Sequence, residues 1–121
     1  MSDNVHVIAT INVQPGRRAD FLAEFWQVVP LVHQEEGCLR YEPTVDVETL
    51  LTSQEDPRTD TVVVLETWES LDALEKHLIA PHMQNYRSKV KDLVAGVDLQ
   101  VLGVASADGE AETEDDSDEE E

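Results

Sequence analysis

The sequence predicts an α+β domain built on one antiparallel sheet, and three features of its 121 residues support this prediction. Several short stretches alternate apolar and polar residues, as half-buried strands do. One long stretch places apolar residues at helical spacing, and capping signals mark two shorter helices. Turn-forming Pro and Gly residues separate these stretches. The resulting order, β-α-β-β-α-α-β, is that of a ferredoxin-like fold with helices on one face of the sheet.

The first half of the chain is expected to hold a strand, a helix and a second strand. Residues 5–13 alternate in hydrophobicity and predict the first strand. Residues 17–36 predict the helix, which Pro30 should kink because it lacks the N–H that its turn requires. Gly37 should end this helix, since glycine tolerates the left-handed conformation. Residues 38–45 read as the second strand.

The second half is expected to hold a polar loop, a strand, two helices and a last strand. Four consecutive β-favouring residues begin at Val62 and are typical of a strand buried on both faces. Ser70 is a favourable N-cap, and Pro81 suits the first turn of a helix. These elements are expected over residues 46–60 (loop), 62–68 (strand), 71–79 and 81–94 (helices), and 97–101 (strand).

Charge divides the chain into a domain of residues 1–105 and a tail. The whole chain has 27 acidic and 8 basic residues, a net charge of −19. Residues 106–121 hold 10 of the acids, no base and no large apolar side chain. They should be a disordered acidic tail, because they cannot bury enough surface to offset the entropy of ordering. The domain keeps 17 acids against 8 bases, a net charge of −9. This predicts a halophilic source with high intracellular salt, and an ordinary acidic protein with an acidic tail is the alternative.

Several classes of function are disfavoured by composition. A negative surface repels nucleic-acid phosphates and anionic lipid, so neither nucleic acid nor a membrane surface is an expected partner. There is no 18-residue apolar run and no basic-then-apolar start, so no membrane span or signal peptide is expected. Cys38 is the single cysteine, which fits a reducing cytoplasm, and it is expected to be a small core residue rather than a nucleophile.

The predicted strands are apolar on both of their faces. A four-stranded sheet with helices on one side would leave its second face bare. A second copy of the chain is the simplest cover for that face, so a homodimer is expected.

The residues most able to carry chemistry lie in the region from the third strand to the third helix. Glu66 and Trp68 are two apart in a predicted strand and therefore share a face. His77 and His82 are five apart, about 140° around a continuous helix, which is poor geometry for chelating a metal. Pro81 interrupts the helix between them, so their relation stays open. A core tryptophan with two half-exposed histidines is the purely structural alternative.

The stretches EEGCLRYEP (35–43) and LETWESLDALEKHLIAPHMQNY (65–86) resemble the antibiotic biosynthesis monooxygenase family, in particular its small bacterial quinol monooxygenases. The resemblance covers about residues 5–104. Its pattern, E-x-W…H…PH, is fairly specific for the family but does not indicate the substrate. It implies a dimeric α/β barrel in which two ferredoxin-like sheets face each other, with an apolar pocket in each subunit. Family members oxidise quinols and related phenols with O₂ and hold no flavin, haem or metal.

The resemblance also implies roles for individual residues. Trp68 would be a pocket wall, and a histidine with a pKa near neutrality suits removal of a phenolic proton. For Asn12 the alternative is a polar residue that only ends a strand, and for Glu66 the alternative is a structural contact rather than a contact with the substrate. The residues so implied are His77, His82 and Trp68 for catalysis, and Tyr86, Asn12 and Glu66 for contact with the substrate.

Cofactor-free oxidation of a small quinol by O₂ is therefore the function expected from the sequence, and other functions stay open. Haem-degrading monooxygenases of the same superfamily need a histidine ligand with an asparagine and a tryptophan nearby, and a tryptophan and histidines are present. A non-catalytic small-ligand or stress-response module suits the same fold, because a fold does not fix a function. An isomerase or a hydrolase on this scaffold is a third alternative.

Overall fold

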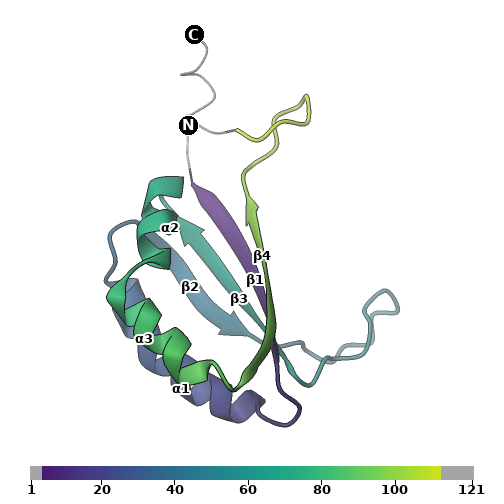
Figure 1. The fold of residues 1–121 in the computed structure, drawn as a ribbon. Coiled ribbons are helices and arrows are strands. Elements are labelled where there is room, and N and C mark those ends of the chain that lie inside the picture. The colour runs from purple at the N-terminus through teal and green to yellow at the C-terminus, as the bar shows by residue number, and fades with distance from the viewer. Residues whose placement is uncertain (1–3, 113–121) are drawn as a thin grey trace.

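The computed structural model describes residues 4–112 and shows one antiparallel four-stranded sheet with the helices packed against one of its faces (Figure 1). The sheet order is β2-β3-β1-β4, which is that of a ferredoxin-like fold. The predicted fold class is confirmed. The elements are β1 (Val5–Val13), α1 (Arg18–His33), β2 (Cys38–Thr44), β3 (Thr61–Trp68), α2 (Leu71–Leu78), α3 (Pro81–Val90) and β4 (Val94–Leu102).

The central strand β1 sets the two faces of the sheet. It pairs antiparallel with β3 on one side and with β4 on the other. Val7 lies opposite Glu66 on β3 and Val101 on β4, so these three side chains share the face that the helices cover. Every second residue of β1 is buried on that face, which confirms the alternation predicted for the first strand.

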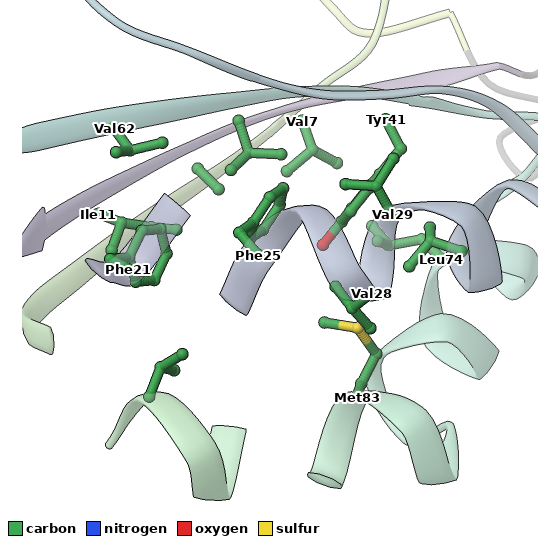
Figure 2. Close-up of a cluster of buried hydrophobic side chains, with 14 of the residues drawn as sticks. Val7, Ile11, Phe21, Phe25, Val28, Val29, Tyr41, Val62, Leu74 and Met83 are labelled. Carbon is green, nitrogen blue, oxygen red and sulfur yellow. The ribbon is translucent and has the colours of Figure 1, made fainter. Parts of the chain in front are cut away.

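The core lies between this inner face and the helices. The buried face of α1 includes Phe21 and Phe25, whose rings stack with centroids 5.8 Å apart. Figure 2 shows Phe25 beside Tyr41 of β2, with Met83 of α3 across the interior. Pro30 lies inside α1, as predicted, on the exposed side of the helix. None of the helices described here is long and apolar enough to cross a membrane.

The boundary between α3 and β4 differs from the prediction. The helix ends at Val90 rather than near residue 94, and the strand already begins at Val94. The Leu93 N–H bonds to the carbonyl of Val90, and the Leu93 carbonyl accepts the N–H of Gln14 at 2.8 Å. Pairing with the end of β1 therefore draws this segment into the sheet. Val90, Leu93 and Val94 also fit helical spacing, which is why local pattern favoured a longer helix.

The outer face of the sheet, away from the helices, is less apolar than predicted. Ile8, Val63 and Leu65 lie at its centre and are half-buried. The two edge strands place charged residues on this face: Asp98 of β4 lies opposite Thr10, and Arg40 of β2 lies opposite Thr67. The strand β3 is therefore buried on its inner face and only half-buried on its outer face within one subunit.

The first residues of the predicted tail have a defined turn. Ala105 pairs with Ala111, and Gly109 adopts φ +94° within the turn. The side chain of Asp108 accepts hydrogen bonds from the Ser106 hydroxyl and from the backbone N–H of Glu110. The polar groups of this turn therefore find hydrogen-bond partners within the turn itself. The rest of the predicted tail, residues 113–121, lies outside the described residues, so the domain boundary at residue 105 stays a prediction.

Candidate functional site

A cavity of about 340 Å³ lies between the inner face of the sheet and α3. Apolar side chains from β1, β3, β4 and α3 supply most of its wall. A cavity of this size and composition suits a small, largely apolar molecule with few polar groups. The polar side chains on the wall are Tyr41, Glu66, His77, Tyr86, Arg87 and Lys91.

His77 reaches this wall from the buried face of α2. The helix starts at Ser70, whose hydroxyl accepts the N–H of Ala73 as predicted. The His77 side chain is only 2% exposed. Its ring lies 4.7 Å from that of Trp68 and 5.2 Å from that of Tyr41, measured between centroids. The imidazole is therefore fixed between two aromatic rings.

Glu35 joins the two predicted histidines. Its two carboxylate oxygens lie 3.0 and 3.1 Å from Nδ1 of His77, and one of them also bonds to Nε2 of His82. Glu35 stands in the turn after α1, where Gly37 has φ +87°. A Cβ at position 37 would lie 2.6 Å from the Cβ of Ala73, so glycine lets this turn approach α2.

The contact with Glu35 selects one tautomer of His77. Burial lowers the pKa of His77, while the hydrogen bond to Glu35 opposes that shift. The ring is therefore neutral at neutral pH, with its Nδ1–H donated to the carboxylate. No described residue makes a hydrogen bond to Nε2 of His77, so this nitrogen remains able to accept a proton.

Glu66 and Trp68 share the inner face of β3, as their spacing in the sequence predicts, and they are also hydrogen-bonded to each other. The Trp68 Nε1–H donates to Oε1 of Glu66 at 2.9 Å. Burial raises the pKa of Glu66 to about 7, with a smaller contribution from Glu35 in the same direction and an opposing one from the Trp68 bond. Trp68 is fully buried, its ring lies against that of His77, and it is not among the residues on the cavity wall, so its role as a pocket wall stays a prediction. Its position holds the polar groups that do line the cavity.

Two phenols complete the polar wall. Tyr86 lines the cavity, as predicted, and Tyr41 joins it from β2. Burial raises the pKa of both side chains above the usual range, and the charge of Glu66 adds to the shift for Tyr41. Both hydroxyls therefore stay protonated and can donate hydrogen bonds to a bound molecule.

The structure does not bring three of the predicted site residues, Trp68, Asn12 and His82, to the wall of the cavity. Asn12 points to the outer face of the sheet, where its side-chain oxygen accepts a hydrogen bond from Thr61. The predicted contact between Asn12 and a substrate stays a prediction, and the even-numbered residues of β1 point away from the helices and from this cavity. His82 lines a separate groove between α1 and α3, and Glu35 links it by hydrogen bonds to His77 on the cavity wall.

Sequence reasoning assigned no role to Glu35 or Tyr41. An acidic residue just beyond the C-terminal end of a helix is unfavourable beside the negative end of the helix dipole. A hydrogen-bond donor nearby offsets this cost for Glu35, but Glu36 carries the same signal and is exposed, so the sequence did not single out Glu35. For Tyr41, the only signal in the sequence was the alternation of side chains along the second strand, which would point Tyr41 toward the core.

Cys38 occupies the edge of the core, as expected. Burial raises the pKa of its thiol to about 11, and the nearby charges of Glu35 and Glu66 add to the shift. The side chain packs against the core as a protonated thiol. Across residues 4–112, no group of three His, Cys, Asp or Glu side chains is placed to hold a metal ion.

The fold and the cavity together define a ferredoxin-like domain with a mostly apolar cavity between its sheet and α3. Residues 4–89 match the family described as antibiotic biosynthesis monooxygenase, and the chain belongs to this family.

Particular relatives sharpen this assignment. The Escherichia coli K12 protein named "Probable quinol monooxygenase YgiN" is 40% identical over 98 residues, covering 79% of this chain and 93% of the relative. The crystal structure of PA3566 from Pseudomonas aeruginosa is 24% identical with a TM-score of 0.72, covering 88% of this chain and 98% of that one. The structure of Rv0793 from Mycobacterium tuberculosis is 26% identical with a TM-score of 0.69, covering 85% and 96%.

Proposed function

We propose that this protein oxidises a small quinol with O₂, without a bound cofactor, and inserts one oxygen atom into the ring. The observation that carries the proposal is the neutral, buried His77 on the cavity wall, whose Nδ1 is held by Glu35. The name of the E. coli relative supports a quinol as the substrate class.

The cavity wall suits an aromatic diol. Phe25 and the aliphatic side chains of the sheet offer apolar contact to a ring. The Tyr41 and Tyr86 hydroxyls, both protonated, can donate to the oxygens of the substrate. A molecule with one or two aromatic rings and polar groups at its edges fits a volume of about 340 Å³.

His77 acts as the base in this proposal. Its Nε2 takes the proton of one substrate hydroxyl, and the Glu35 carboxylate stabilises the imidazolium that forms. The resulting phenolate is electron-rich enough to pass one electron to O₂, and the two radicals recombine to form the new C–O bond. One oxygen atom stays on the ring with the hydrogen displaced from carbon. The other leaves as water with the hydrogens of the two substrate hydroxyls.

The proposed working unit is a homodimer. Val97, Leu99 and Val101 of β4 share the inner face of the sheet, but the helices do not cover them, and Val97 is 57% exposed. Val97 and Leu99 also line the cavity, so its wall on this side is open in one subunit. A second copy of the chain would remove these side chains from water and exclude water from the site. Light scattering should give a mass near twice 13.5 kDa, and a folded monomer at micromolar concentration would contradict this part of the proposal.

Oxygen uptake tests the proposal. Purified protein treated with a metal chelator should accelerate O₂ consumption by 1,4-naphthohydroquinone above the rate in buffer. Unchanged rates across several quinols would reject the enzymatic function and leave a ligand-binding module. Titration with haem tests the alternative, because a stoichiometric Soret shift that requires His77 would favour haem chemistry instead.

A further inference from the structure

We infer that Glu66 is a second proton-transfer group of the site and pairs with the second hydroxyl of the substrate. The inference rests on the proposed function and deepens it, since it makes the substrate a hydroquinone with two free hydroxyls rather than a monophenol.

The geometry of the Glu66 carboxyl supports this role. The residue is 7% exposed, lies on β3 between its sheet partners Val7 and Tyr41, and lines the cavity. Its Oε1 accepts the indole N–H of Trp68 at 2.9 Å. Within the described chain, no hydrogen bond reaches Oε2. A buried carboxyl oxygen without a partner is costly, so the missing partner should come from the cavity.

The indole of Trp68 keeps this carboxyl in place. Trp68 is fully buried, and its ring contacts those of His77 and Tyr41, with centroids 4.7 and 6.5 Å away. One oxygen of Glu66 is therefore tied to a fixed donor, and the other is left for the ligand. Trp68 is a positioning residue in this arrangement, because it acts through Glu66 and does not touch the cavity.

The surroundings of Glu66 leave it able to exchange a proton near neutral pH. Burial is the main reason that its pKa is raised to about 7, and no described cation makes an ion pair with it. Arg87 and Lys91 stand on the cavity wall without a hydrogen bond to it. The titratable and charged groups near it are Cys38 and Tyr41 of β2, Glu35 after α1, His77 of α2, Tyr86 and Arg87 of α3, and Lys91 just after α3.

The balance of the reaction uses two proton carriers. The hydrogens of both substrate hydroxyls end in the water that is released. His77 can hold one of these protons on Nε2 while the Glu66 carboxylate holds the other on Oε2. Each group then returns its proton to the departing oxygen atom. A monophenol would leave Glu66 without a partner.

The variant Glu66→Gln tests this role, because it keeps the volume and an oxygen acceptor for Trp68 but cannot carry a proton. We expect kcat/KM for 1,4-naphthohydroquinone to fall about 100-fold, the lower range for a positioned acid–base group. The inhibition constant of the monomethyl ether of the same diol should stay nearly unchanged. The exposed Glu69→Gln is the matched control and should behave as the unmodified protein. Equal losses with both ligands, or no loss with the diol, would overturn the inference.

Fluorescence provides a readout that does not need turnover. Trp26 is 54% exposed, so a Trp26→Phe background leaves Trp68 as the reporter. Trp68 emission should titrate with a midpoint near pH 7, and Glu66→Gln should abolish that transition. An inactive protein that still shows the transition would refute the proposed function alone. Emission that is flat between about pH 5 and 9 would overturn the role of Glu66 whatever the activity.

Discussion

Two carboxyl groups, those of Asp46 and Glu66, both accept side-chain hydrogen bonds but differ in their donors and in their burial. Asp46, in the exposed loop between β2 and β3, meets Arg58 in a bidentate contact with both distances 2.8 Å. Glu66 meets only the neutral indole of Trp68, in a buried position. The Arg58 contact holds the pKa of Asp46 below its usual range, whereas burial raises that of Glu66 to about 7.

The difference shows what makes a carboxyl available for chemistry. A cation and water keep Asp46 ionised throughout the physiological range, so it can only hold the loop in place. Glu66 is buried without an ion pair to a described cation, and it shares the cavity with a histidine whose pKa is lowered, again by burial. Burial therefore moves the pKa values of an acid and a base toward each other, which is the condition for exchanging protons.

The largest expected effect comes from removing the base. His77→Gln cannot accept a proton at neutral pH, and kcat/KM for a naphthohydroquinone should fall by about 10²- to 10⁴-fold. His33→Gln is the control, since His33 is an exposed histidine that bonds only to the backbone carbonyl of Tyr41. Steady-state kinetics with circular dichroism would check both variants. Full activity in a folded His77→Gln protein would show that His77 is not the base.

A smaller effect is expected from the residue that orients His77. Glu35→Gln removes the charge that raises the pKa of His77 against the effect of burial, so that pKa should fall further. Activity that depends on the neutral imidazole should then begin at lower pH, while the maximal rate drops by about tenfold or more because the tautomer is no longer fixed. A pH–rate profile distinguishes this from simple destabilisation. An unshifted acid limb would argue against coupling between Glu35 and His77.

The two carboxyls should also give stability opposite dependences on pH. Glu66 binds its proton more tightly in the folded state than in the unfolded state, so its contribution should fall as pH rises from about 4.5 to about 7. The depressed pKa of Asp46 gives a contribution that is present above the usual carboxyl range and is lost only in stronger acid. Urea titrations should show that the free energy of unfolding falls by about 3 kcal/mol at most over this rise in pH. The fall should be absent in Glu66→Gln and retained in Asp46→Asn. Equal slopes in all three proteins would contradict the assignment of Glu66.

Salt is expected to act on the whole acidic surface rather than on one residue. The domain without residues 106–121 still carries a net charge of −9. Repulsion within and between subunits should weaken as the Debye length falls from about 10 Å at 0.1 M to about 3 Å at 1 M. Melting temperatures of the full chain and of a chain ending at Ala105 should both rise between 0.1 and 2 M KCl. Unchanged melting temperatures would remove the halophilic interpretation.

Most of the fold could be predicted because its signals are local. Alternation in residues 5–13 and the Ser70 cap each act within a few residues, and both are confirmed. The end of α3 could not be read in this way. Leu93 fits a helix by spacing, and only its pairing with Gln14 across the sheet decides for the strand.

The site was predictable where two residues share one element and not where several elements meet. Glu66 and Trp68 lie on one strand, and alternation along that strand predicted that they share a face, although it did not predict their hydrogen bond. Alternation along β1 likewise places Asn12 on the outer face with the other even-numbered residues of the strand, whereas the resemblance to the family implied a contact between Asn12 and the substrate. Glu35 was missed because its partners come from α2 and α3, which no spacing in the sequence connects to the end of α1.

Isotope labelling tests the central claim most directly. The protein should turn over 1,4-naphthohydroquinone under ¹⁸O₂, and mass spectrometry should find one labelled oxygen in each oxidised ring. The label should be lost in His77→Gln, because the phenolate that reacts with O₂ would no longer form in the cavity. Unlabelled quinone released with hydrogen peroxide at the same rate would contradict the account, since it would show that the protein reduces O₂ without inserting oxygen.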